Sequence, residues 1–152
     1  MTDPDGGRIV IASDHAGFAL KTHLAEYLRG RGLAVDDLGP DDEGSCDYPD
    51  FAHRVAERVV AGREGAERVV GVLVCGTGIG MSMAANRHRG VRAALCAEPY
   101  SARMSRQHND ANILCLAARV LGVGLAEAIV DAFLDASFEG GRHTRRVAKI
   151  ER

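Results

Sequence analysis

Short, uninterrupted apolar runs are the feature of this sequence that most restricts what it can fold into. The clearest run, at residues 68–75, reads RVVGVLVC and shows no regular alternation of apolar and polar residues. A run of this kind predicts a strand buried on both faces, as in a parallel sheet covered by helices. Four further runs are expected to form strands, at residues 8–13, 34–38, 91–96 and 113–116.

Segments with helical patterns lie between these runs. Residues 18–31 repeat apolar side chains at helical spacing, and Gly30 and Gly32 are expected to end that helix. Asp50 is expected to cap a helix that stops at Gly62. The other helices are predicted from the turn after residue 75 to about residue 87, at residues 99–108 and 121–138, and from about residue 141. This alternation predicts an α/β fold of three layers, Rossmann-like, with helices flanking a five-stranded parallel sheet.

Length and charge limit the organisation of the chain and its partners. Its 152 residues fit one domain, and we expect a disordered lead-in at residues 1–7 followed by a single domain at residues 8–152. The formal net charge of −2 argues against binding to nucleic acid or to a membrane surface. No apolar run approaches the roughly 18 residues of a membrane-spanning helix.

The cysteines, Cys46, Cys75, Cys96 and Cys115, show none of the paired spacings typical of metal sites. The N-terminal residues are acidic and glycine-rich, unlike a secretion signal. We therefore expect reduced thiols, a cytoplasmic protein and no metal. Because at least three of the cysteines lie in or beside apolar runs, buried packing is the default interpretation for each.

Potentially reactive side chains follow the carboxyl ends of two predicted strands, where parallel sheets bind their ligands. Asp14 and His15 follow the first strand, and Cys75 ends the most apolar one. The glycines at positions 76, 78 and 80 let the backbone approach a ligand closely. The free amides of this turn favour negative charge, and Thr77 adds a hydroxyl group.

Three familiar motifs do not fit this turn. Its glycines have the wrong spacing for a dinucleotide fingerprint, and a Walker loop with its lysine is absent from the sequence. A cysteine phosphatase loop needs an arginine six positions after the cysteine, where Met81 stands. Two interpretations remain open: a thiol beside amides that hold an oxyanion, and an inert thiol in a tight strand–helix turn.

The histidines near the predicted strands also have two interpretations each. Either Asp14 and His15 contact a ligand, or Asp14 caps a helix and His15 is simply exposed. His108 closes a helix just before the fifth strand. Either His108 exchanges a proton near neutral pH during catalysis, or it stands there because the helix dipole favours a histidine at the C-terminal end of a helix.

The densest basic cluster lies near the C-terminus. Arg142 and Arg146 are four residues apart and share one face of the predicted helix, with His143 beside them. Arginine forks match phosphate oxygens, so the cluster is a phosphate site or a solvated tail. Arg119, after the fifth strand, could join a phosphate site.

Seven motifs occur in order between about Arg8 and Ile150. They are SDHAGF at residues 13–18, DYP at 47–49, CGTGIG at 75–80, AANR at 84–87, EPYSA at 98–102, SRQHNDAN at 105–112 and EGGRH at 139–143. With these motifs the chain resembles ribose-5-phosphate isomerase type B, in the family that includes the galactose-6-phosphate isomerase subunits. One branch of that family uses a glutamate as base, whereas this chain is similar to the branch that uses a cysteine.

The resemblance implies a role for each candidate residue. Cys75 would be the base that moves a proton between C1 and C2, with Thr77 stabilising the enediolate. His108 would open the sugar ring, with Asp14 as its partner. The amides of Gly76, Gly78 and Gly80 would also stabilise the enediolate, and Tyr48 and Asn109 would contact the sugar. The phosphate would be held by basic side chains, namely His15, Arg119, Arg142 and Arg146, with His143 nearby.

The activity implied by the resemblance is the interconversion of ribose 5-phosphate and ribulose 5-phosphate in the pentose phosphate pathway, without metal or cofactor. The resemblance also implies a homodimer or a dimer of dimers, with active sites between subunits and a C-terminal helix packed on the partner. The alternatives are the same chemistry on allose 6-phosphate, galactose 6-phosphate or a tetrose phosphate, and a phosphosugar-binding regulator without activity. The loop at residues 40–46 is where the choice of sugar could differ.

Overall fold

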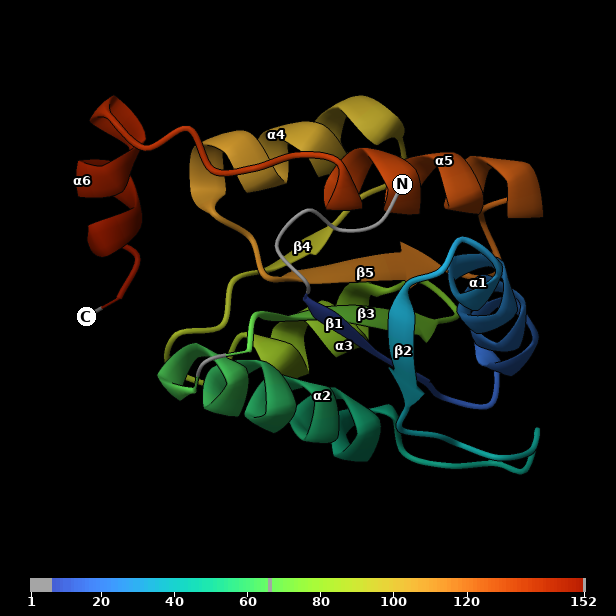
Figure 1. Ribbon diagram of the computed structural model, residues 1–152. Coiled ribbons are helices and arrows are strands. Elements are labelled where there is room, and N and C mark those ends of the chain that lie inside the picture. Colours follow the sequence, from blue (N-terminus) through green and yellow to red (C-terminus); the bar gives the residue numbers. More distant parts are fainter. Residues whose placement is uncertain (1–6, 66, 152) are drawn as a thin grey trace.

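The computed structural model describes residues 7–65 and 67–151, which form a parallel sheet of five strands (Figure 1). The strand order is β2-β1-β3-β5-β4, and every pairing in this sheet is parallel. The strands are β1 (Arg8–Ser13), β2 (Ala34–Asp37), β3 (Val69–Cys75), β4 (Ala93–Leu95) and β5 (Ile113–Ala117). The predicted number and direction of the strands are confirmed.

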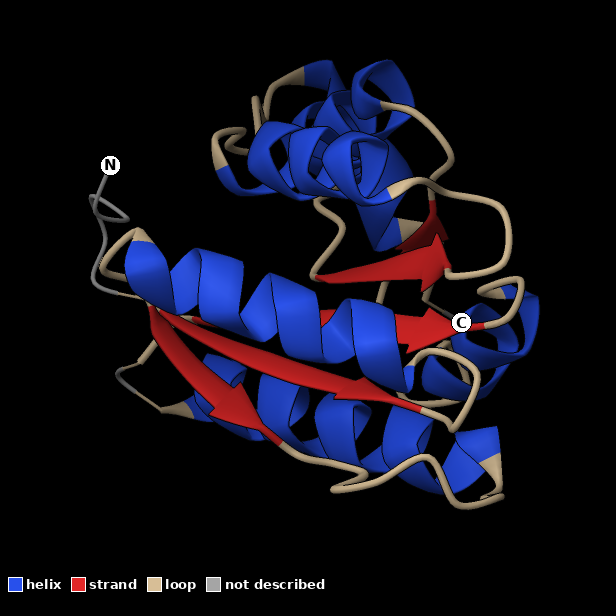
Figure 2. Ribbon diagram, turned by 90° about the vertical axis from the view of Figure 1, so that its right-hand side faces the viewer, coloured by secondary structure: helices blue, strands red, loops and turns tan. Residues whose placement is uncertain are grey.

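Helices cover both faces of the sheet, which gives the predicted three layers (Figure 2). They are α1 (Phe18–Gly30), α2 (Tyr48–Glu64), α3 (Ile79–Ala85), α4 (Pro99–Asn109), α5 (Val123–Leu134) and α6 (Arg142–Ala148). One core cluster joins the sheet to α1, α4 and α5, and the other joins it to α2 and α3. Within the described part of the chain, every helix is too short or too polar to cross a bilayer.

Strand β3 lies at the centre of the sheet, and all seven of its residues are buried. Val72 and Val74 face the cluster with α1 and α5, whereas Leu73 and Cys75 face α2 and α3. A Cβ atom at Gly71 would lie 2.6 Å from the Val55 side chain, so this glycine lets α2 pack against the strand. The continuous apolar run is thus explained by burial on both faces.

Several predicted boundaries are wrong by a few residues. Helix α2 begins at Tyr48, after Asp47, so Asp50 lies inside its first turn. The helix continues to Glu64, past Gly62, because that glycine serves packing: a Cβ atom there would lie 2.4 Å from Val69. Helix α5 ends at residue 134 and not 138, and β4 spans three residues. Apart from the ordered Gly7, the predicted lead-in lies outside the described residues.

A buried lysine holds the start of the segment between β2 and α2. Lys21 is 1% exposed, and its Nζ lies 2.8 Å from an Asp37 carboxylate oxygen and 2.7 Å from the Pro40 carbonyl oxygen. Residues 41–45, which follow, are all exposed. The segment is therefore anchored near its start and open to solvent in its middle.

Candidate active site

A cavity of about 420 Å³ lies at the carboxyl ends of β1 and β3. The sheet register sets Ser13 of β1 beside Val74 of β3, which brings the segments after both strands together. The cavity is lined by Asp14, His15, Ala16, Tyr48, Cys75, Gly76, Thr77, Ile79, Gly80, Met83 and Arg119. The structure thus brings together eight of the fourteen residues that the sequence suggested for the site.

Cys75 ends β3 with its sulfur atom turned toward the following turn. The side chain is 5% exposed, and the backbone N–H of Gly78 donates a hydrogen bond to Sγ at 3.1 Å. Gly78 has φ +73°, and a Cβ atom there would lie 2.5 Å from Leu95. Only glycine fits this position, so the turn that aims an amide at the sulfur depends on it. Gly78 approaches the sulfur but does not itself line the cavity.

The other cysteines differ from Cys75 in their surroundings. Burial, with a smaller contribution from Glu98, raises the pKa of Cys96 to about 11. Burial likewise raises the pKa of Cys115. Cys46 is half-buried in the loop before α2, and only Cys75 of the four lines the cavity. For Cys96 and Cys115 the default interpretation of inert packing holds.

Thr77 and Arg119 complete the turn around the thiol. The Thr77 hydroxyl oxygen accepts a hydrogen bond from the Ile79 amide at 3.3 Å. The Arg119 amide donates to the Gly76 carbonyl at 3.1 Å, and the Arg119 side chain lies 3.5 Å from where a Cβ atom of Gly76 would be. A guanidinium group therefore lies over the turn, where it can bind an anionic ligand.

Asp14 and His15 have defined partners on the other side of the cavity. The Asp14 carboxylate accepts a hydrogen bond from the Gly17 amide at 3.0 Å, and its side chain is buried. His15 Nδ1 accepts a hydrogen bond from the Cys46 amide at 3.3 Å. Because Nδ1 is an acceptor, the neutral ring carries its proton on Nε2, which leaves that N–H to donate to a ligand.

Tyr48, the first residue of α2, also lines the cavity. Its ring rests on Gly80, where a Cβ atom would lie 2.6 Å from the ring carbon Cε2. The tyrosine is 42% exposed, and the neighbouring side chains of Ile79 and Met83 are 46% and 64% exposed. The apolar pair Ile79 and Met83 lines the cavity although the sequence analysis did not select it. The sequence signal for this pair is its spacing from the turn, since Ile79 lies two residues and Met83 six residues after Thr77.

The remaining candidates lie apart from this cavity within one chain. His108 and Asn109 end α4, and Arg142, His143 and Arg146 belong to α6. Helix α4 begins near the carboxyl end of β4 and runs back to the edge of the sheet where β5 begins. Its axis is about 16 Å long, so its last residues lie at the edge opposite the cavity. Figure 1 shows α6 on that side, far from the arrowhead of β5. The sequence predicted one set of residues, and the structure divides it into two.

The second group is organised around two stacked histidine rings. The centroids of His108 and His143 are 4.3 Å apart with 11° between the planes, and Glu139 Oε2 lies 3.9 Å and 3.8 Å from their Nε2 atoms. Burial, with help from His108 and the neighbouring arginines, lowers the pKa of His143, while Glu139 opposes the change. The sequence analysis missed Glu139, although its spacing of four residues from His143 was a signal.

The atoms of this histidine–glutamate group are close enough together to hold a metal ion. A metal bound to imidazole lies in the plane of the ring, along the nitrogen lone pair. Two nearly parallel stacked rings cannot both direct lone pairs at one ion without turning. The geometry of the two rings therefore suits a metal centre poorly.

Comparison with known proteins places these features in context. A family model described as Ribose/Galactose Isomerase matches residues 9–150. Ribose-5-phosphate isomerase B of Escherichia coli is 48% identical over 143 residues, which cover 94% of this chain and 93% of the relative. The crystal structure of a ribose 5-phosphate isomerase from Thermotoga maritima is 51% identical, with a TM-score of 0.91 and coverage of 95% and 97%. Ribose-5-phosphate isomerase B from Mycoplasma genitalium, with bound ribulose 5-phosphate, is 46% identical, with a TM-score of 0.89 and coverage of 94% and 93%.

Proposed function

The chain belongs to the ribose/galactose isomerase family, and from this premise we propose that it interconverts ribose 5-phosphate and ribulose 5-phosphate with Cys75 as the base. The observation that carries the proposal is the Cys75 sulfur, held 3.1 Å from a backbone amide in a cavity lined by His15 and Arg119. A thiolate there has a donor that stabilises its charge, and the substrate phosphate has two basic side chains nearby.

In the proposed reaction the open-chain aldose binds with C1 and C2 beside Cys75. The thiolate takes the C2 proton, and the electron pair of that bond forms the C1–C2 double bond of an enediolate. The proton of the C2 hydroxyl passes to O1, and the thiol returns its proton to C1, which gives the ketose. Donors from Thr77 and the turn amides would stabilise the enediolate, each with about 2.7–4 kcal/mol.

Ring opening and phosphate binding need the second group of residues. We assign His108 as the acid that opens the furanose, with Asp14 as its partner, and Asn109 as a sugar contact. Arg142 and Arg146 would hold the phosphate with the cavity residues. Binding of the phosphate, which does not react, would position the sugar for proton transfer.

Because these groups lie apart in one chain, the proposal requires a homodimer or a dimer of dimers whose sites form between subunits. The exposure of Ile79 and Met83 at the rim of the cavity supports a partner there, since apolar side chains gathered beside a polar site typically mark an interface. α6 would then pack on the partner subunit. A cytoplasmic location and a metal-free reaction remain part of the proposal.

Solvent deuterium exchange tests the role of Cys75. In D₂O the wild-type enzyme is expected to incorporate deuterium into the sugar, because the thiol exchanges its proton with solvent during turnover. Cys75→Ala is expected to lose both exchange and turnover while ribose 5-phosphate still binds. Cys96→Ala, at another buried cysteine, is the matched control and should retain both. Exchange that persists in Cys75→Ala would exclude the thiol as the base.

Mixing two inactive variants tests the shared site. A dimer with one Cys75→Ala chain and one His108→Ala chain has one site with both residues intact. Random reassociation of equal amounts is therefore expected to restore about a quarter of wild-type activity. If each chain carried a complete site, mixing would restore nothing.

A further inference from the structure

Glu139 is a charged residue beside the proposed ring-opening acid, and the proposed function gives it no role. It lies between α5 and α6, and its Oε2 atom is 3.9 Å from His108 Nε2 and 3.8 Å from His143 Nε2. The two rings are stacked, with 11° between their planes. One carboxylate oxygen therefore faces the same nitrogen atom of both rings.

Backbone contacts set the place of this carboxylate. The Glu139 amide donates to the Gln107 carbonyl at 3.0 Å, so Glu139 is bonded to the residue next to His108. Gly140 and Gly141 have φ +66° and +55°, which lets the chain turn from Glu139 into α6. Helix α4 therefore supplies one ring of the pair, while the turn and α6 supply the carboxylate and the other ring.

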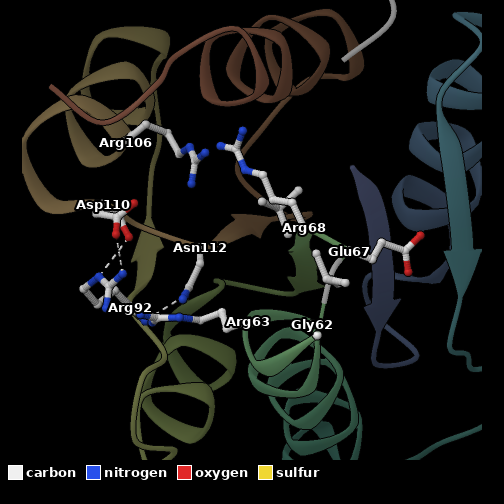
Figure 3. A pocket seen from close by; sticks show the side chains of 11 residues that line it. Gly62, Arg63, Glu67, Arg68, Arg92, Arg106, Asp110 and Asn112 are labelled. Carbon is white, nitrogen blue, oxygen red and sulfur yellow. Dashed lines mark hydrogen bonds and ion pairs between the residues drawn. The ribbon is translucent and has the colours of Figure 1, made fainter. Parts of the chain in front are cut away.

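The end of α4, which carries His108, is held by contacts that do not involve Glu139. Arg92 donates through Nε to the carbonyl groups of Asn109 and Asp110, at 3.1 Å and 2.8 Å. Its guanidinium group also lies 2.7 Å from the Asp110 carboxylate, and Figure 3 shows this pair joined. A neutral side chain in place of Glu139 should therefore leave the backbone of α4 where it is and change only what faces the rings.

The stacked rings do not share positive charge equally. Two imidazolium rings with centroids 4.3 Å apart repel one another, so the pair favours a single positive charge. Burial, followed by repulsion from His108 and from the arginines of α6, lowers the pKa of His143, and Glu139 opposes that change. The His143 side chain is 9% exposed and that of His108 is 37% exposed, so His108 is the ring that a sugar can reach. A proton attracted by the carboxylate is therefore available to a sugar on His108.

We propose that Glu139 is a positioning residue for ring opening, whose carboxylate orients the His108 ring and favours its cationic form. This inference rests on the proposed function, in which His108 is the acid. In that step His108 gives its proton to the ring oxygen of the furanose as the bond between C1 and that oxygen breaks. The proton of the C1 hydroxyl passes to Asp14, and its electron pair forms the C1 carbonyl group. Glu139 touches neither reacting atom and acts through His108.

Ribulose 5-phosphate separates ring opening from proton transfer, because its phosphorylated O5 cannot close a furanose and the sugar stays an open chain. In D₂O the wild-type enzyme is expected to exchange a hydrogen at C1 of this ketose, which NMR measures. Glu139→Gln keeps the size of the side chain and removes its charge. It is expected to lower kcat for ribose 5-phosphate at least about tenfold and to keep the exchange rate within about twofold of wild type. Both sugars carry the same phosphate, so weaker phosphate binding would lower both rates together.

Three further variants complete the test. Glu139→Asp restores the charge on a shorter side chain and should turn over ribose 5-phosphate at least about threefold faster than Glu139→Gln. In a His108→Ala background, Glu139→Gln should have no further effect on that sugar. Glu127→Gln is the matched control, because the Glu127 carboxylate also pairs with a histidine, His23 at 2.7 Å, but from α5, and it should leave both rates unchanged.

The outcomes separate this inference from the proposed function. Equal losses of turnover and exchange in Glu139→Gln, or wild-type turnover of ribose 5-phosphate, would overturn the role of Glu139 and leave the isomerase activity standing. A further loss in the His108→Ala background would show that Glu139 acts without that ring and would also overturn the inference. A wild-type protein that neither turns over ribose 5-phosphate nor exchanges ribulose 5-phosphate would refute the proposed function, and this inference with it.

Discussion

Replacing Gly80 by alanine should separate activity from stability in this enzyme. A Cβ atom at this position would lie 2.6 Å from Cε2 and 2.7 Å from Cζ of Tyr48. Carbon atoms pack at about 3.5 Å or more, so the ring has to move by about 1 Å. Tyr48 is half-exposed, which means that the ring can move outward at little cost to the fold.

The two consequences have opposite signs. A displacement of about 1 Å in a substrate-positioning side chain can cost about 100-fold in rate, so we expect kcat/KM to fall about 10- to 100-fold. Gly80 lies in α3 without a positive φ, where alanine favours the helix by about 0.5–1 kcal/mol. The thermal midpoint should therefore stay the same or rise.

Two controls accompany this measurement. Gly124→Ala, in α5, introduces a Cβ atom that meets nothing within 4 Å, so it should stabilise the protein and leave kcat/KM unchanged. In a Tyr48→Ala background, already slower by itself, Gly80→Ala should have little further effect because the ring is gone. A Gly80→Ala variant that retains kcat/KM within about twofold, or that loses as much stability as a core substitution, would refute this role of the contact between Gly80 and Tyr48.

Further predictions concern the groups around the sugar and the phosphate. His108→Ala should reduce turnover of ribose 5-phosphate far more than turnover of a four-carbon aldose phosphate, which cannot form the furanose; equal losses would remove the ring-opening role. Arg142→Ala and Arg146→Ala should raise KM for phosphosugars with a smaller change in kcat, while Arg145→Ala, an exposed neighbour in α6, should behave as wild type. Alkylation by iodoacetamide at pH 8 should spare Cys96, because a pKa of about 11 leaves about 0.1% of its thiol as thiolate; peptide mass spectrometry that finds Cys96 modified in the folded protein would contradict this. Among aldose phosphates, kcat/KM should be highest for ribose 5-phosphate, and a preference for a hexose phosphate would transfer the proposal to that sugar.

The central strand and the thiol could be predicted because their signals are local. Continuous apolar character requires burial on both faces, and the first polar contact after such a strand falls at the edge where ligands bind. The position of Cys75 and of the glycines after it therefore follows from residues 68–80, whereas the role of the thiol came from the resemblance to the family. The collision between a Cβ atom of Gly80 and Tyr48 does not, since it joins residues 32 positions apart through the packing of α2.

Other features depend on contacts that no short segment contains. Gly62 looks like the end of a helix, but it continues α2 because Val69 of β3 packs where its side chain would be. The distance between His108 and Cys75 follows from topology: a helix between parallel strands must return to the edge where the next strand begins. The hydrogen bonds of Arg106 could not be foreseen, because they join its side chain to carbonyl groups in two separate loops.

The segment between β2 and α2 has a consequence for how this protein can change. Lys21 fixes its start through the carbonyl group of Pro40, and the Cys46 amide ties its end to His15, while residues 41–45 are exposed to solvent. Insertions, deletions or new side chains in those five positions leave the core and Cys75 untouched. A lineage could thus rewrite this short stretch of surface, which ends beside His15 of the cavity, while the fold persists.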